Sequence, residues 1–117
     1  MANVFTNKLT NSIGTVPAVV YEPPNTAPNV IDYATVIGCT IANITDTETV
    51  KIDLFVRDVD SAVTYILKNA DLESGTAQVP VGGEQKLVLL PDQALLAGSD
   101  TENSIDVSVS VLEITEE

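Results

Sequence analysis

The stretch Ile105–Ile114 (I-D-V-S-V-S-V-L-E-I) decides the fold class of this chain. From residue 105 to residue 111, isoleucine and valine alternate with aspartate and serine, so one face is apolar and the other is polar. A period of two predicts a β-strand with one buried face. Val50–Val56 repeats the pattern, with Lys51 and Asp53 on its polar face. The two stretches predict an all-β protein whose last strand ties the chain end into a sheet.

Shorter apolar and β-branched runs predict the remaining strands. These runs are a short edge strand from Val4-Phe5, Val30–Ile44 with a bulge or bend at Gly38, Thr49–Arg57, Ala62–Lys68, Lys86–Leu90 and the apolar piece Ala94–Ala97. Short polar turns join the second, third and fourth of them, which predicts an antiparallel meander. Residues 69–86 are expected to be irregular, and the helical pattern in residues 92–97 is too short for a stable helix. The chain is expected to fold as a single antiparallel β-sandwich or jelly-roll, two architectures that local pattern does not distinguish.

The distribution of proline predicts that the chain has two parts. Residues 1–29 form an N-terminal edge strand and an extended, proline-rich segment, and residues 30–117 form the β-sandwich domain. Proline withholds an amide donor and fixes φ, so the E-P-P-N-T-A-P-N stretch is predicted to be a loop or an extended arm. The segment 9–29 either reaches a neighbouring molecule or crosses the surface of its own sandwich. In the first case Pro23, Pro24 and Pro28 are candidate subunit contacts.

Composition excludes several classes of function. The chain of 117 residues has 17 acidic and 5 basic residues and no histidine, which gives a formal net charge of −12. That charge repels nucleic-acid phosphates and anionic membranes, so neither is an expected partner. It suits a solvated acidic surface or contact with a basic partner. The single cysteine, Cys39, rules out an internal disulfide and is expected to be buried, and the sequence has no signal-peptide pattern.

No residue pattern indicates an active site, and no enzyme activity or cofactor is expected. The chain lacks histidine, and Cys39 stands in an apolar run, so the usual general base and thiol nucleophile are missing. Asp58-x-Asp60 is a candidate calcium ligand pair, although Asp is also common in turns because it caps its own backbone. Gly82-Gly83-Glu84 lacks the spacing of a phosphate loop and predicts a hairpin turn. Asn43-Ile44-Thr45 matches a glycosylation sequon by chance.

Phe55 is the candidate contact residue within the sandwich. It lies on the Lys51/Asp53 face of its strand, opposite the apolar stripe that begins at Val50. A large aromatic side chain there is covered by a second subunit, exposed to solvent, or buried under a second layer of the same domain. If a second subunit covers it, Phe55→Ser should leave folding nearly intact and weaken oligomerisation.

Several segments in series resemble small β-sandwich virion proteins of tailed bacteriophages, in particular those of cyanobacterial and other aquatic hosts. They are V-I-G-C-T-I-A-N-I (Val36–Ile44), K-I-D-L-F-V-R-D, Y-I-L-K-N-A, V-P-V-G-G-E-Q-K-L-V-L and D-V-S-V-S-V-L-E-I. The resemblance covers residues 30–115. The insert D-L-E-S-G-T-A-Q, residues 71–78, departs from it because a shorter crossing is expected there.

The resemblance implies a structural virion component made in the host cytoplasm. Within that group a capsid decoration (cement) protein is favoured, a small β-sandwich, often trimeric, on the outer face of the head. Its implied partners are the major capsid protein or other virion proteins and further copies of the chain. The alternatives are a tail, neck or fibre-associated module of the same fold, and a receptor- or carbohydrate-binding β-sandwich.

Overall fold

The computed structural model describes residues 2–24, 31–82 and 85–115, and the regular structure in these ranges is entirely β-strand. The strands are β1 (Ala2–Ile13), β2 (Ala18–Tyr21), β3 (Tyr33–Asn43), β4 (Val50–Arg57), β5 (Val63–Leu72), β6 (Ala77–Val81), β7 (Leu87–Leu89), β8 (Ala94–Ser99) and β9 (Ile105–Thr115). The all-β prediction is confirmed. Among the described residues no helix is long and apolar enough to span a membrane.

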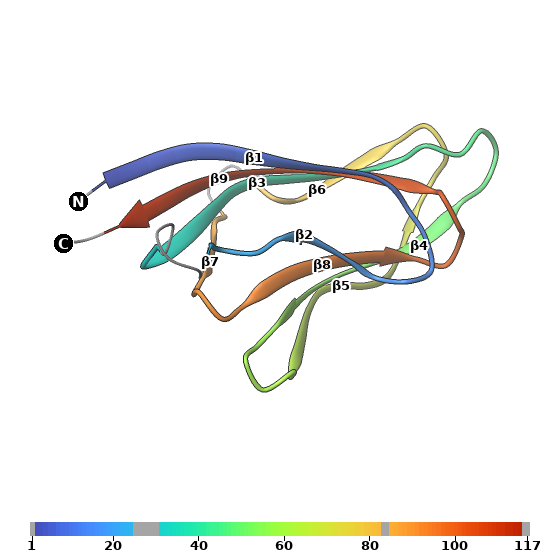
Figure 1. The fold of residues 1–117 in the computed structure, drawn as a ribbon. Helices are drawn as coiled ribbons and strands as arrows, with labels where there is room; N and C mark the ends of the chain where they lie inside the picture. Colours follow the sequence, from blue (N-terminus) through green and yellow to red (C-terminus); the bar gives the residue numbers. More distant parts are fainter. Residues whose placement is uncertain (1, 25–30, 83–84, 116–117) are drawn as a thin grey trace.

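The strands form two antiparallel sheets that pack face to face (Figure 1). Sheet A has the order β1-β9-β3-β6, with β7 also paired to β3, and sheet B has the order β2-β8-β4-β5. Each strand of the first half of the chain therefore pairs with a strand of the second half, in reverse order. A long antiparallel hairpin rolled in this way is a jelly-roll. The structure thus decides between the two architectures that the sequence left open.

A β-bulge keeps the inner face of β3 apolar over its whole length. The register of β3 on β9 shifts between Val36 and Gly38. Without the shift, strict alternation would turn the residues after Gly38 to the opposite face. With it, Val36 on one side and Cys39 and Ile41 on the other are all fully buried. The bulge predicted at Gly38 is confirmed.

The core between the sheets is aliphatic. Its fully buried members include valine, isoleucine and leucine from both sheets, and the odd-numbered residues of β9 from Ile105 to Val111 contribute one continuous row. Cys39 belongs to this core, as expected, and burial raises the pKa of its thiol from 9.0 to about 12. A thiol with so high a pKa remains protonated at neutral pH and is a poor nucleophile.

The predicted meander is wrong at its first connection, because β3 lies in sheet A and β4 lies in sheet B. Both strands have an apolar face, so packing face to face buries more apolar surface than pairing edge to edge.

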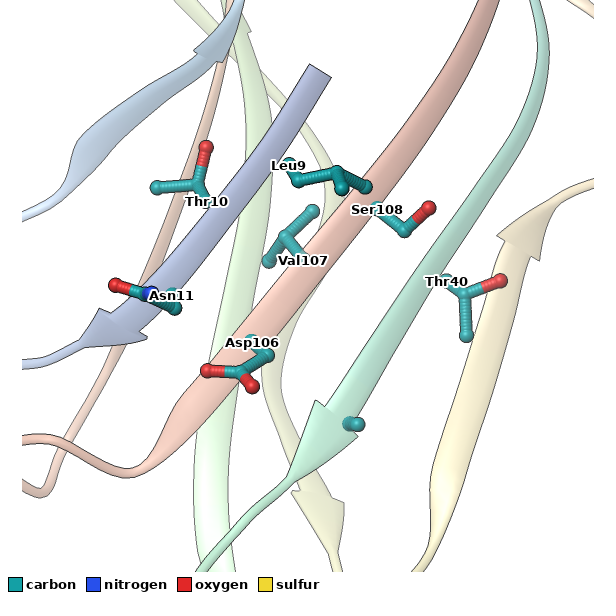
Figure 2. A pocket seen from close by; sticks show the side chains of 8 residues that line it. Leu9, Thr10, Asn11, Thr40, Asp106, Val107 and Ser108 are labelled. Atoms are coloured by element: carbon teal, nitrogen blue, oxygen red, sulfur yellow. The ribbon is translucent and has the colours of Figure 1, made fainter. Parts of the chain in front are cut away.

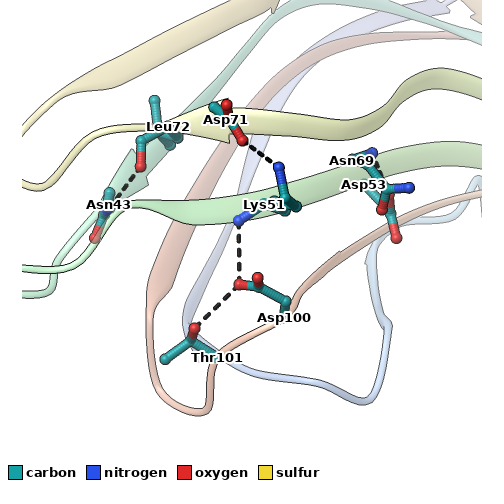
Figure 3. Close-up of polar contacts among 8 residues, drawn as sticks. All are labelled: Asn43, Lys51, Asp53, Asn69, Asp71, Leu72, Asp100 and Thr101. Atoms are coloured by element: carbon teal, nitrogen blue, oxygen red, sulfur yellow. Dashed lines mark hydrogen bonds and ion pairs between the residues drawn. The ribbon is translucent and has the colours of Figure 1, made fainter.

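The buried side chain of Asn43 fixes this crossing: its Nδ2 donates to the carbonyls of Glu48 and Leu72, both at 2.8 Å. Its Oδ1 accepts from the amide of Thr45 at 2.9 Å. The Asn43-x-Thr45 sequon thus begins the connection between β3 and β4, and Figure 3 shows the bond from Asn43 to Leu72.

The segment 69–86, expected to be irregular, contains the end of β5 and all of β6. Asn, Ala and Asp at residues 69–71 are poor strand formers, and pairing with β4 overrides that preference. Asn69 adopts a positive φ of 53°, and its amide donates to Asp53 Oδ1 at 2.8 Å. Lys51 forms an exposed ion pair with Asp71 at 2.7 Å. Figure 3 shows both contacts on the outer face of sheet B.

The N-terminal segment is part of the sandwich. Residues 9–13 end β1 in sheet A, β2 belongs to sheet B, and the connection between them is held at several points. The amide of Ser99 donates to the Gly14 carbonyl at 3.0 Å, and the amide and hydroxyl of Thr15 both bond to the Glu102 carboxylate. Residues 9–24 therefore form a crossover within their own domain, and the division at residue 29 does not separate two structural parts. Residues 25–29 of the segment lie outside the described residues.

Candidate functional site

The titratable side chains of the described residues form no metal-binding cluster. No three His, Cys, Asp or Glu side chains in residues 2–24, 31–82 and 85–115 come close enough to hold a metal ion. In the candidate calcium pair, the backbone carbonyl of Asp58 accepts from the Ser61 amide at 2.9 Å within the turn, and its Oδ1 accepts from Gln93 Nε2 at 2.8 Å.

The candidate proline contacts differ in burial. Pro23 is fully buried within its own chain. Pro24 is partly buried, and its carbonyl accepts a hydrogen bond from the Ile31 amide at 3.3 Å. Pro28 lies outside the described residues. The sandwich of its own chain covers the apolar ring of Pro23. Pro23 therefore does not lie in an extended arm, which corrects the expectation from the sequence.

Phe55 lies in a row of side chains across the outer face of sheet B. We call this set the outer-face row, and it consists of the cross-strand neighbours Val19, Leu96, Phe55 and Tyr65, on β2, β8, β4 and β5. The Phe55 and Tyr65 rings have centroids 5.3 Å apart with a tilt of 49°, and Lys68 Nζ lies 4.9 Å from the Tyr65 centroid. Phe55 is only 8% exposed. Neighbouring side chains of its own sheet cover it, and no second layer of the described residues does so.

The most exposed aromatic side chain, Phe5, lies elsewhere, on β1. This strand pairs with β9 on one side, and among the described residues no strand of sheet A pairs with its other side. Phe5 is 74% exposed and Leu9 is 68% exposed. Figure 1 shows β1 at the border of sheet A, with its N-terminal half extending past sheet B. We call the unpaired side of β1 from Asn3 to Asn11 the open edge.

The other sheet edges are blunted in the ways that prevent pairing with further strands. β5 has bulged pairing with β4 and a residue of positive φ at Asn69. β6 contains Pro80, and β7 has only three residues. β2 has four residues and follows Pro17. The open edge, in contrast, keeps one register on β9 from Ala2 to Thr10 and contains no proline.

The outer face of sheet A beside the open edge is lined by small side chains. Leu9, Ser108 and Thr40 lie side by side on β1, β9 and β3, as Figure 2 shows. They border a hollow of about 370 Å³ that is open to solvent. Ser110 and Gly38 continue the small residues along the same face. The hollow lacks a convergent set of charged groups, and its place next to Leu9 makes it part of the surface around the open edge.

Sequence reasoning predicted the edge position of Val4-Phe5 and missed the extent of the strand. The missed signal is an alternation in β1, where Phe5 and Leu9 share one face with Asn3, Asn7 and Asn11. Asparagine is rare in strands, so this pattern reads as a loop when only propensity is used. Pairing with β9 holds these residues extended.

Comparisons with known proteins identify the fold and no family. No protein-family model matches the chain, and no curated protein does. Among solved structures, a subunit from work on Bacillus endospore appendages, described as a novel family of disulfide-linked pili, has a TM-score of 0.56 at 9% identity, covering 97% of this chain and 89% of that one. At this identity the likeness is one of fold.

Two structures of a viral protein show weaker likenesses. The VP2 subviral particle of infectious bursal disease virus has a TM-score of 0.40 at 10% identity, and the Gx strain structure of that virus has 0.41 at 10% identity. This chain is covered to 98% and 100%, and those chains to 42% and 43%. The chain thus spans less than half of the viral chains it matches.

Proposed function

We propose that this protein is a structural component of a bacteriophage particle, and specifically a decoration (cement) protein on the outer face of the head. The observation that carries the proposal is the contrast between a closed aliphatic core and one long sheet edge that is regular from Ala2 to Thr10, has Lys8 as its charged residue, and exposes Phe5 and Leu9. Monomeric proteins generally protect such edges, so an open one suits a protein that works in an assembly.

Two further points support a role in assembly. The resemblance of Val36–Ile44 and the segments that follow it is to phage virion proteins. The fold is shared with a subunit of bacterial pili, which are also assemblies. Neither point specifies the head, and the tail, neck or fibre remains the alternative position.

The mechanism of a cement protein is binding without chemistry. A protein that contacts neighbouring capsid subunits binds the assembled shell and not the free subunits, so it stabilises the shell in the way that any ligand stabilises the state it prefers. The net charge of −12 favours a basic surface on that shell. The expected partners are therefore the major capsid protein and further copies of this chain.

The copy number in purified particles tests the proposal. Quantitative mass spectrometry should find this chain at a ratio to the major capsid protein near one, or at another large fraction of it. A few to a few dozen copies per particle would move the protein to the tail or neck. Absence from washed particles would overturn the virion assignment.

A second experiment tests stabilisation directly. Heads that lack this protein should release their DNA at a lower temperature, and adding back the purified protein should restore the original temperature. Restoration should saturate at the copy number found by mass spectrometry. Heads that bind the protein and melt at an unchanged temperature would contradict the cement mechanism.

A further inference from the structure

We propose that the open edge is a self-association site, at which β1 of a second copy pairs antiparallel with β1 about a two-fold axis through Asn7. This inference goes beyond the proposed function, because it concerns the isolated protein and holds whichever position in a particle the chain occupies. It joins sheet A of the two copies into one continuous sheet.

The side-chain pattern of β1 indicates that a second copy of the chain binds this edge. The order of residue types on one face of the strand is nearly the same when it is read from either end. One face of the strand has Asn3, Phe5, Asn7, Leu9 and Asn11 in order. When a second copy is placed antiparallel and centred on Asn7, Phe5 lies opposite Leu9 of the second copy, and Leu9 lies opposite its Phe5. The outer asparagines then face each other as well. A two-fold interface needs a surface that complements itself in this way, and apolar cross-strand pairs stabilise it.

Backbone geometry allows the same register. In an antiparallel pair, residues directly opposite one another are either both hydrogen-bonded to the partner strand or both not. Centring on a single residue pairs odd-numbered residues with odd and even with even. The backbone amides and carbonyls of β1 that point away from β9 therefore lie opposite the same groups of the second copy, to which they can hydrogen-bond. On the opposite face the register places Thr6 against Lys8 of the second copy, and Val4 against its Thr10.

Charge also favours this edge for contact between copies. All 17 acidic residues lie at or after Glu22, and Lys8 is the charged residue of β1. Two nearby carboxylates on β9 are engaged within the chain: Asp106 accepts from the Ser12 amide at 2.8 Å, and Glu113 accepts from the Tyr21 hydroxyl at 2.6 Å. The open edge is thus a part of this acidic protein where two copies meet without opposing carboxylates. Because each copy has a net charge of −12, added salt should strengthen the association by screening the long-range repulsion.

The mass of the full chain in solution tests the inference. Sedimentation equilibrium between about 10 µM and 1 mM, in low salt and in about 0.5 M NaCl, covers the range in which a modest interface forms. We expect the mass to rise from 12.4 kDa to twice that value with concentration, and to rise at lower concentration in high salt. A monomer throughout would overturn the inference. A trimer, the symmetry that the resemblance implies, would overturn it too.

Substitutions at the axis test the register. Asn7→Asp places two carboxylates opposite each other and should weaken the dimer about tenfold. Asn103→Asp is the matched control, because it makes the same change at an exposed turn of the β8–β9 connection and should leave the dimer constant unchanged. Thermal melting checks that both variants are folded. An Asn7→Asp dimer as tight as the wild type would contradict the pairing.

A mixing experiment distinguishes the two-fold pairing from any other use of β1. Asn7→Lys alone should also weaken the dimer, because like charges then face each other. An equimolar mixture of Asn7→Asp and Asn7→Lys should dimerise more strongly than either variant alone, since residue 7 of one copy faces residue 7 of the other. Failure of the mixture to recover association would overturn the assigned axis. None of these measurements depends on particles, so this inference and the proposed function can fail separately.

Discussion

The outer-face row and the open edge are two apolar surfaces of one molecule that differ in their exposure to solvent. Phe55 in the outer-face row is 8% exposed, and Phe5 at the open edge is 74% exposed. Both aromatic side chains point away from the core. The difference arises because β4 has a neighbouring strand on each side, whereas β1 has one. Phe55 is covered by cross-strand neighbours, and Phe5 has none on its unpaired side.

This contrast separates residues that stabilise the fold from residues available for association. An outward-facing apolar side chain on an interior strand contributes to folding through its cross-strand pairs. The same type of side chain on an open edge adds little to the stability of the monomer. The five experiments below test this division, beginning with the largest expected change.

Phe55→Ala should lower the free energy of unfolding by about 3 kcal/mol, because it removes a buried aromatic side chain and leaves a cavity. The matched substitution Phe5→Ala should change it by less than about 0.5 kcal/mol. Urea denaturation of both variants measures the difference. This result would replace the expectation that substitution of Phe55 leaves folding nearly intact. Equal losses in the two variants would show that the two surfaces do not differ.

Tyr21→Phe should lower the free energy of unfolding by about 1–2 kcal/mol at neutral pH. The Tyr21 hydroxyl in sheet B donates to Glu113 on β9 of sheet A, opposite Val4, so this contact connects sheet B to the strand that β1 pairs with. Urea denaturation at pH 7 checks the loss. No change would mean that the edge is held without this bond.

The same contact predicts a dependence on alkaline pH. Burial, the hydrogen bond and the negative charge of Glu113 raise the pKa of Tyr21 above its ordinary value of 10.0. The unfolded chain therefore releases this proton at a lower pH than the folded chain, and stability should fall as the pH rises above about 10. Tyr21→Phe should show a shallower fall, with a residual slope above about pH 9 from Cys39, whose pKa is also raised.

The ring pair in the outer-face row should have a measurable coupling. A double-mutant cycle of Phe55→Ala and Tyr65→Ala should give an interaction energy of about 1 kcal/mol, as expected for tilted aromatic rings with centroids 5.3 Å apart. Urea denaturation of the four proteins measures it. An additive result would mean that Tyr65, which is 44% exposed, does not cover Phe55.

The smallest effect on monomer stability is expected at the open edge itself. The double variant Phe5→Ser with Leu9→Ser should unfold within about 0.5 kcal/mol of the wild type, because both side chains are solvated in the monomer. Denaturation at about 1 µM, where association is negligible, measures the monomer alone. A larger loss would place these side chains among the residues that stabilise the fold.

The sequence by itself determined the fold class and the strands with a clear period of two. Ile105–Ile114 and Val50–Val56 form β9 and most of β4, and the bulge at Gly38 lies where it was expected. These features are local: alternation and glycine fix which side of a strand is apolar and where a strand bends. The sequence signal for β8 was weaker, because a strand that is buried on both faces does not alternate between apolar and polar residues.

Only the tertiary structure decided how these strands are used. Strand order, the crossing after Asn43 and the inclusion of residues 9–24 in the sandwich depend on contacts between residues far apart in the chain. The same is true of exposure, which made Phe55 part of the fold and left Phe5 at the surface. An alternation with a period of two shows which side of a strand is apolar. Whether another strand covers that side depends on the position of the strand within its sheet, and local sequence does not encode that position.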